Sequence, residues 1–169
     1  NNSGGNMVNL DKCISYEEYI STAKEEEILF IDELYKQGRL VSHGVEDIKN
    51  IKSNINILVI TDTFCKDSAT TMPFLMKLSE LNSKIHVNFL KKEGKEELLQ
   101  ELSGECRIPT IIKLDEKKQM KGKYIEFPQV VREKINGKNE EERKAIVEEV
   151  RSGKYNDEIQ KEIIKLILK

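Results

Sequence analysis

The sequence predicts an α/β domain in which helices cover both faces of a mixed sheet of four to five strands. Two observations support this fold class: strand and helix patterns alternate in the middle of the chain, and helical patterns flank that region on both sides. The chain has 169 residues, enough to bury a core without disulfides or metals. Two strands joined by a helix should be parallel, with a right-handed crossover.

The chain begins with helical patterns. Ser15 and Glu18 have capping-box spacing, in which each side chain accepts a hydrogen bond from the other residue's backbone N–H. A second amphipathic stretch ends at Gly38, a residue type that commonly ends helices. A third, short helix is expected around 45–52.

The middle of the chain alternates between strand and helix. Residues 57–60 (Ile-Leu-Val-Ile) form the apolar, β-branched run of a strand buried on both faces. A helical pattern follows from Cys65 to Leu81, and Pro73, which lacks a backbone N–H, should bend that helix. The remaining expected elements are a strand at 85–89, a helix at 95–103, and two strands fitting a hairpin at 110–114 and 120–126.

The chain ends in two further helical patterns, near 139–151 and 156–168. These patterns divide the chain into four segments: 1–6, a tag remnant or flexible tail; 7–53, an N-terminal helical extension packed on the core; 54–136, the sheet-bearing core; and 137–169, a C-terminal helical extension.

The amino-acid composition argues against a nucleic-acid-binding protein, a membrane-spanning protein and a disulfide-rich domain. Charged residues make up 34% of the chain, but the formal net charge is −2, without the basic excess typical of nucleic-acid binding. No apolar run approaches the roughly 20 residues that span a bilayer. Three widely spaced cysteines do not suit a disulfide scaffold. We therefore expect a cytoplasmic protein that binds neither nucleic acid nor membrane.

Residues 61–73, "TDTFCKDSATTMP", carry the candidate chemistry. Cys65 stands where the helix begins, and the unsatisfied N–H groups there stabilise a thiolate. Lys66 favours the thiolate and Asp67 opposes it. The functional reading is a nucleophilic thiol with a pKa below the free value of about 8.5, and the alternative is a buried, inert cysteine. Ser68, three positions on, can donate a hydrogen bond to the thiolate but cannot form a disulfide.

The core, over roughly 54–136, resembles the thioredoxin superfamily. The stretch Phe64 to Ser68 stands where thioredoxins carry Trp-Cys-X-X-Cys, and Pro73 stands where they carry the proline that kinks the helix. Arg107 to Thr110 ("RIPT") lies where they carry the cis-proline. The helical ends resemble those of an uncharacterised bacterial branch of thioredoxin-like proteins, here in a monothiol Cys-X-X-Ser form.

The resemblance implies a thioredoxin fold with extra N- and C-terminal helices, and it assigns roles to residues. Cys65 and Ser68 are the implied catalytic pair. A cis bond before Pro109 would expose backbone beside Cys65, where an extended peptide can pair. The implied substrate-binding residues are Phe64, Lys66, Asp67, Ile108, Pro109 and Thr110. One departure is that Val59 stands where the family has a buried Asp, six positions before the cysteine.

The other chemistry-bearing residues are few. Cys106 could resolve a mixed disulfide if its Cα lay within about 7 Å of that of Cys65; the alternative is an ordinary loop or core cysteine. His43 and His86 lack ligand spacing with the cysteines, so we expect neither a metal site nor a cofactor. Monothiol glutaredoxins with Cys-X-X-Ser can hold an iron–sulfur cluster, but the charged, bulky residues after Cys65 disfavour that reading.

The sequence thus supports two hypotheses and leaves open whether the protein is an enzyme. In the first, Cys65 attacks the disulfide of a protein or small molecule, and an external thiol resolves the mixed disulfide; the expected partners are a disulfide-bearing protein or a low-molecular-weight thiol. In the second, the same groove is a redox-inactive binding module for an extended peptide or protein. Under either hypothesis the terminal helices offer surface for a homodimer.

Overall fold

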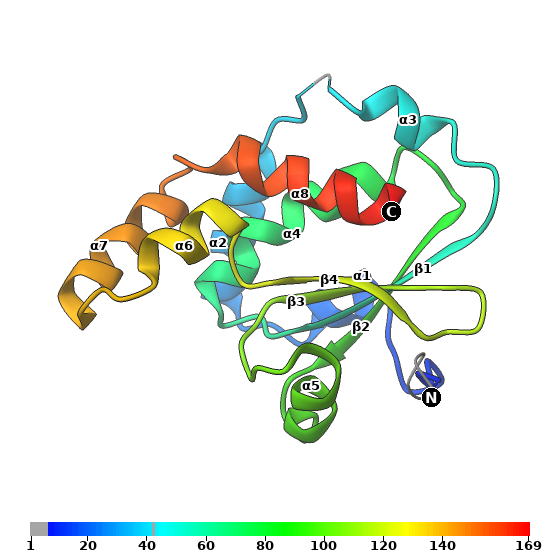
Figure 1. The fold of residues 1–169 in the computed structure, drawn as a ribbon, viewed down its shortest axis with the longest axis horizontal. Helices are drawn as coiled ribbons and strands as arrows, with labels where there is room; N and C mark the ends of the chain where they lie inside the picture. Colours follow the sequence, from blue (N-terminus) through cyan, green and yellow to red (C-terminus); the bar gives the residue numbers. More distant parts are fainter. Residues whose placement is uncertain (1–6, 42) are drawn as a thin grey trace.

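The computed structural model describes residues 7–41 and 43–169, and in it helices cover both faces of a mixed sheet (Figure 1). The sheet has four strands in the order β2-β1-β3-β4. The strands are β1 (Ile55–Thr61), β2 (Ile85–Lys91), β3 (Thr110–Leu114) and β4 (Met120–Ile125). The segment 1–6, for which a tag remnant or flexible tail is expected, lies outside the described residues.

Helices precede, connect and follow the strands. The expected capping box starts the first helix, with Ser15 Oγ accepting from the Glu18 N–H at 3.1 Å and Glu18 Oε1 accepting from the Ser15 N–H at 2.9 Å. Pro73 lies inside the fourth helix. The helices are α1 (Tyr16–Ser21), α2 (Glu25–Gln37), α3 (Val45–Lys49), α4 (Lys66–Ser79), α5 (Glu96–Ser103), α6 (Gln129–Ile135), α7 (Glu140–Arg151) and α8 (Asn156–Leu168).

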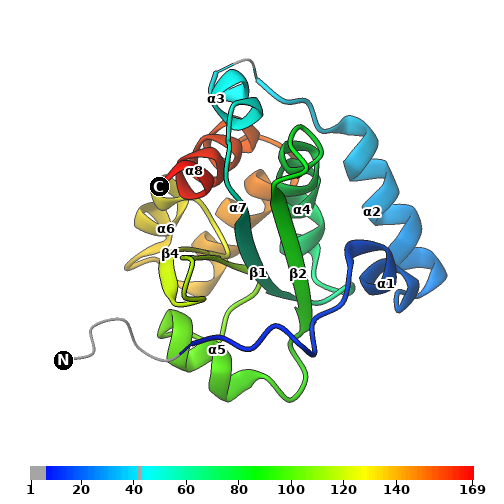
Figure 2. The ribbon, with the colours of Figure 1, turned by 90° about the vertical axis from the view of Figure 1, so that its right-hand side faces the viewer.

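The sheet separates two apolar layers. β1 pairs in parallel with β2 and antiparallel with β3, and β3 forms the expected hairpin with β4. Because side chains alternate along a strand, Ile57 and Val59 enter the layer under α4 and α8, whereas Leu58 and Ile60 enter the layer over α5. All four are 0% exposed, which confirms a strand buried on both faces. Figures 1 and 2 show α5 on one side of the sheet and α4 and α8 on the other.

Both terminal extensions pack on this core. At the N-terminal side, Ile14 exchanges two backbone hydrogen bonds with Phe89 of β2, and the Tyr19 ring of α1 stacks on Phe89 with centroids 5.1 Å apart. At the C-terminal side, Ile159 and Ile163 of α8 are fully buried. Figure 2 shows α8 lying beside α4. Within the described part of the chain, no helix combines the length and apolar character needed to cross a membrane.

Candidate functional site

Cys65 lies at the junction of β1 and α4, where it is the N-cap residue of the helix. Its Sγ accepts a hydrogen bond from the backbone N–H of Ser68 at 3.4 Å, as an N-cap side chain does. The same sulfur lies 3.8 Å from the carbonyl oxygen of Ile108. The sequence therefore predicts the local position of this thiol correctly, and the structure brings it together with the loop at 107–110.

That loop runs opposite the start of α4. The Ile108–Pro109 peptide bond is cis. The Pro109 carbonyl accepts from the Glu126 N–H at 2.7 Å, and the buried Thr110 hydroxyl donates to the Arg107 carbonyl at 2.7 Å. These bonds fix the loop, so the Ile108 carbonyl is held facing the sulfur.

The expected direction of the Cys65 pKa is wrong. Burial is the largest influence and raises the pKa of this thiol above its ordinary value, because a thiolate loses hydration there. The backbone N–H groups of Ser68 and Asp67 and the Ser68 hydroxyl act in the opposite direction, and the Asp67 carboxylate raises the pKa further. The helix N-terminus is present as expected, but its stabilisation of the thiolate is smaller than the loss of hydration.

Ser68 is almost fully buried beside the sulfur. It is 1% exposed, and its Oγ has no hydrogen-bond partner among the described residues. The hydroxyl nevertheless lies close enough to Cys65 to lower the pKa of the thiol. An unpaired buried hydroxyl is costly, so this donor is available for a charged sulfur or for another polar atom beside it.

Asp67 is held by the C-terminal extension. Its carboxylate accepts two hydrogen bonds from Arg151 of α7, at 2.9 and 3.1 Å, and the residue is 6% exposed. A forked guanidinium on a carboxylate is the strongest side-chain pairing available here. Asp67 was expected to bind substrate, but in this structure its carboxylate is occupied by Arg151. The two residues are 84 positions apart in the sequence, so no motif spacing could have predicted their pairing.

The exposed side of the site is apolar and basic. Phe64, directly before Cys65, is 66% exposed. The Lys66 ammonium lies 6.0 Å from the centre of the Phe30 ring of α2, a cation–π arrangement. Thr63 donates to Glu27 at 2.9 Å, which fixes α2 against the loop before Cys65. The expected contact residues Phe64 and Lys66 therefore do face solvent, and α2 adds Phe30 to them.

Charged side chains border the site on the side of α6 and α7. Glu126 carries a largely buried carboxylate, 11% exposed, that lies 3.5 Å from Arg107 and 3.8 Å from Arg143 of α7. Burial raises the pKa of Glu126, with the Asp67 carboxylate adding to the rise and the arginines opposing it. Sequence reading missed this group, because Glu126 follows a strand with no motif around it. Only its position next to Pro109 in the folded protein marks Glu126 as part of the site.

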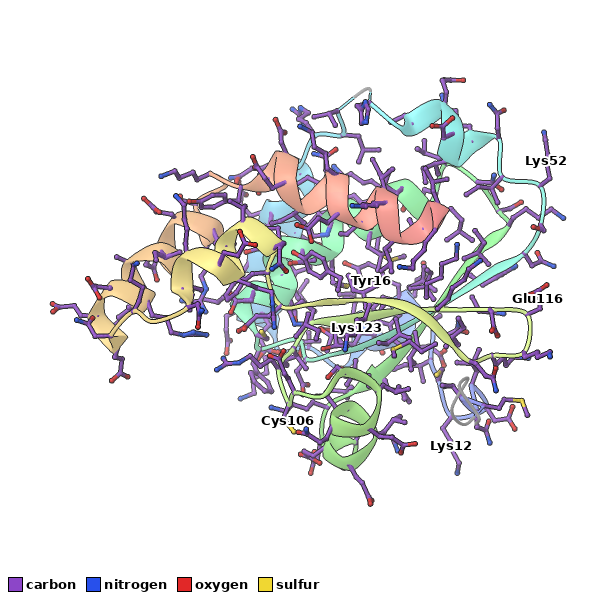
Figure 3. The ribbon with its side chains drawn as sticks, in the orientation of Figure 1. Lys12, Tyr16, Lys52, Cys106, Glu116 and Lys123 are labelled. Carbon is purple, nitrogen blue, oxygen red and sulfur yellow. The ribbon has the colours of Figure 1, made fainter. Side chains whose placement is uncertain are left out.

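Cys106 is exposed, and its thiol faces α5 (Figure 3). Its Sγ lies 3.4 Å from Gln100 Oε1 and 3.8 Å from the Glu96 carbonyl. Cys106, Cys65 and Cys13 are all free thiols in this structure. The resolving role suggested for Cys106 therefore stays a prediction. Across 7–41 and 43–169, no three His, Cys, Asp or Glu side chains gather in a way that could hold a metal ion.

Known proteins match this chain in sequence pattern and in fold. A family model described as thioredoxin matches residues 13–151. A crystal structure of a protein of unknown function from Pseudomonas aeruginosa superposes with a TM-score of 0.78, at 18% identity over 94% of this chain and 93% of that one. An HIV epitope-scaffold gives a TM-score of 0.77, at 19% identity over 94% of both chains. Such identities establish the fold alone. No curated protein matches this sequence.

Proposed function

Because the chain belongs to the thioredoxin family, we propose that it is a monothiol thiol–disulfide exchange protein that acts through Cys65. One observation carries the proposal: the sulfur sits at the N-cap of α4, with the Ser68 N–H on one side and the Ile108 carbonyl on the other. A helix N-terminus is one of the environments that favour a nucleophilic cysteine, which also needs an open approach. Cys65 is partly exposed, and the proposal requires that a substrate sulfur reach its Sγ from the solvent.

The reaction has two exchanges. The Cys65 thiolate attacks one sulfur of a substrate disulfide, the substrate S–S bond breaks, and the second substrate sulfur leaves as a thiolate. An external thiolate then attacks the mixed disulfide and returns Cys65 as a thiolate. Ser68 cannot perform this second attack because its hydroxyl is a poor nucleophile. Its role in this scheme is to donate a hydrogen bond to the sulfur.

The partner in this scheme is a disulfide-bearing protein or a low-molecular-weight thiol in the cytoplasm. An exposed aromatic ring at Phe64 and the cationic Lys66 lie next to the sulfur and offer contacts to such a partner. The backbone at Ile108 lies across from them. An extended segment carrying a disulfide would thus be held on both sides of the reacting sulfur.

Turnover of a low-molecular-weight disulfide in the presence of excess reducing thiol tests the proposal. Cys65→Ser should reduce the rate to that of the buffer. Cys106→Ser, the matched control, should keep at least half of the native rate, and a larger loss would assign Cys106 the resolving role. Equal rates for the native protein and Cys65→Ser would contradict the exchange function.

The alternative, a redox-inactive binding module, is favoured by one observation: burial raises the pKa of Cys65, so the thiol is the dominant form near neutral pH. Under this alternative a bound peptide would need neither the sulfur nor its ionisation. Partners recovered equally from the native protein and from Cys65→Ser would support the binding module.

A further inference from the structure

Glu126 combines two features that lower stability. Its φ is +63°, a backbone conformation that glycine adopts freely and other residues seldom do. Among the described non-glycine residues, only Lys118 shares a positive φ, and it lies in the turn between β3 and β4. The Glu126 side chain is 11% exposed, and burial raises its pKa because a carboxylate loses hydration there. Strain and burial together at one residue point to a role for its side chain.

The contacts of Glu126 join two parts of the molecule. Its backbone N–H donates to the Pro109 carbonyl at 2.7 Å, which ties it to the loop at 107–110 that faces the reactive sulfur. Its carboxylate lies 3.5 Å from Arg107, in the same loop, and 3.8 Å from Arg143 of α7. Glu126 therefore connects a helix of the C-terminal extension to that loop.

A second ion pair connects α7 to the other side of the site. Arg151, two helical turns after Arg143 and thus about 12 Å further along α7, donates two hydrogen bonds to the Asp67 carboxylate in the first turn of α4. A cavity of about 370 Å³ is lined by all four residues of the two pairs. The helix α7 is thus linked to both elements that flank Cys65: the start of α4 and, through Glu126, the loop at 107–110.

We propose that Glu126 is a positioning residue, which with Arg143 holds the loop at 107–110 in place relative to Cys65. The inference rests on the proposed exchange function, in which an extended substrate segment pairs with the backbone of that loop. The C-terminal extension then sets how well the protein accepts a disulfide carried by an extended peptide. A small disulfide has no main chain to pair, so its reaction at Cys65 does not depend on the position of the loop.

The charges around Glu126 explain why its carboxylate is needed. The hydrogen bond from the Thr110 hydroxyl to the Arg107 carbonyl lies within the loop, so it cannot set the position of the loop relative to α7. The Glu126 carboxylate lies between two guanidinium groups, one from the loop and one from α7. Without it, Arg107 and Arg143 would be two like charges facing the same space, and their repulsion would move the loop away from α7.

Two substrates that share the same small thiol test this role. One is oxidised β-mercaptoethanol, and the other is a synthetic peptide whose single cysteine forms a disulfide with β-mercaptoethanol, so the two differ only in the peptide. Turnover of each is followed with an excess of reducing thiol. Glu126→Gln should raise the KM for the peptide disulfide about 5–20-fold, because pairing with the loop is weakened. The kcat for the peptide disulfide and the rate with the small disulfide should change less than about twofold.

Further variants separate positioning from a general effect on the fold. Glu126→Gly should behave like Glu126→Gln, and it covers the case in which Glu126→Gln does not fold, because glycine adopts the positive φ without strain. Arg143→Gln should raise the same KM, and the double variant with Glu126→Gln should be no worse than either single change, as expected of two residues that act through one contact. Lys144→Gln, which removes a positive charge from an exposed position on α7, should match the native protein with both substrates.

Three outcomes would overturn the positioning role. Equal losses with both substrates would mean that Glu126 acts on Cys65 itself or on the whole fold. An unchanged KM for the peptide disulfide in Glu126→Gly would exclude a role for the side chain. Additive effects of Glu126→Gln and Arg143→Gln would mean that α7 acts separately from Glu126. A native protein that reacts with neither substrate would instead contradict the exchange function, which is a separate result.

Discussion

At the scale of single residues, the helix N-terminus and the loss of hydration have opposite effects on the pKa of Cys65. A charge at a helix end is stabilised by about 0.3–1 kcal/mol, less than the 1.36 kcal/mol that corresponds to one pKa unit. Removing a thiolate from water works against this and is the larger effect here, since the pKa of Cys65 is raised. The helix N-terminus alone therefore does not make this cysteine acidic.

Asp67→Asn should make Cys65 more reactive. The Asp67 carboxylate raises the pKa of the thiol. Its removal leaves the Arg151 guanidinium, which interacts electrostatically with Cys65, with the Glu148 carboxylate at 3.8 Å in place of the closer Asp67. We expect the alkylation rate of Cys65 at pH 7 to rise about 3–10-fold, which corresponds to a shift of half to one pKa unit. Asp157→Asn should leave it unchanged. A slower reaction in Asp67→Asn would show that loss of the ion pair distorts the site.

Glu126 should make stability depend on pH in a defined direction. Burial raises its pKa in the folded protein above the ordinary value of 4.5. The folded state then holds the proton more tightly than the unfolded state, so stability falls as pH rises from about 4.5 through the folded pKa. Urea unfolding should show the native protein losing stability relative to Glu126→Gln over that range.

The exposed Glu97→Gln provides the control for this pH dependence. Its dependence on pH is the reference for the Glu126→Gln curve, because both variants remove one carboxyl group and only that of Glu126 is largely buried. A native protein that gains stability relative to Glu126→Gln as pH rises would mean that the pairs with Arg107 and Arg143 outweigh burial.

At the scale of elements, sequence pattern predicts most helices and strands, because each has a clear period or a signal at its ends. The strand expected at 110–114 is β3 without change, and the helix expected at 156–168 is α8. The pattern does not predict α6, which has 7 residues and no side-chain cap at Pro128. A helix of two turns is too short for its period to stand out.

Alanine substitutions at two glycines with the same backbone conformation distinguish the cost of backbone strain from the cost of a steric clash. Gly44 has a φ of +82° and Gly104 a φ of +81°, so alanine is strained at both, at about 1–2 kcal/mol. A Cβ at Gly44 would lie 2.8 Å from Ile164 Cγ2 of α8, whereas a Cβ at Gly104 would meet nothing within 4 Å. Gly44→Ala should therefore destabilise the protein by about 1–3 kcal/mol more than Gly104→Ala. Equal losses in thermal unfolding would show that the contact between α3 and α8 relaxes freely.

At the scale of the whole molecule, the terminal helices are part of one core. The periods of the sequence predict that α7 and α8 form, but not what they pack against. Lys113 is the clearest example: it lies in a strand, is 6% exposed, and donates to the carbonyls of Ile167 and Lys169 at the end of α8. A cation at a helix C-terminus is favourable, yet its partners are more than 50 positions away. Long-range pairs of this kind could not be predicted from a single sequence.

Ile163→Ala should destabilise the entire protein and not α8 alone. Its side chain is 0% exposed in the layer that includes Ile57 and Phe74. We expect a loss of about 2–5 kcal/mol, with far-UV circular dichroism and tyrosine fluorescence changing together. Leu168→Ala, at 41% exposure, is the comparison and should lose under about 1 kcal/mol. Separate transitions for the two probes in Ile163→Ala would show that α8 unfolds independently of the sheet.

The most direct test of the exchange function compares two thiols in one molecule. The native protein is treated with a small disulfide at pH 8, and mass spectrometry follows mixed-disulfide formation at each cysteine. Cys106 is exposed and Cys65 is half-buried, so accessibility alone favours Cys106. We predict that Cys65 is modified first, because the Ile108 carbonyl and the exposed Phe64 and Lys66 beside the sulfur would hold the disulfide there, which outweighs the raised pKa of the thiol. Rapid modification of Cys106 while Cys65 stays unmodified would contradict the proposed function.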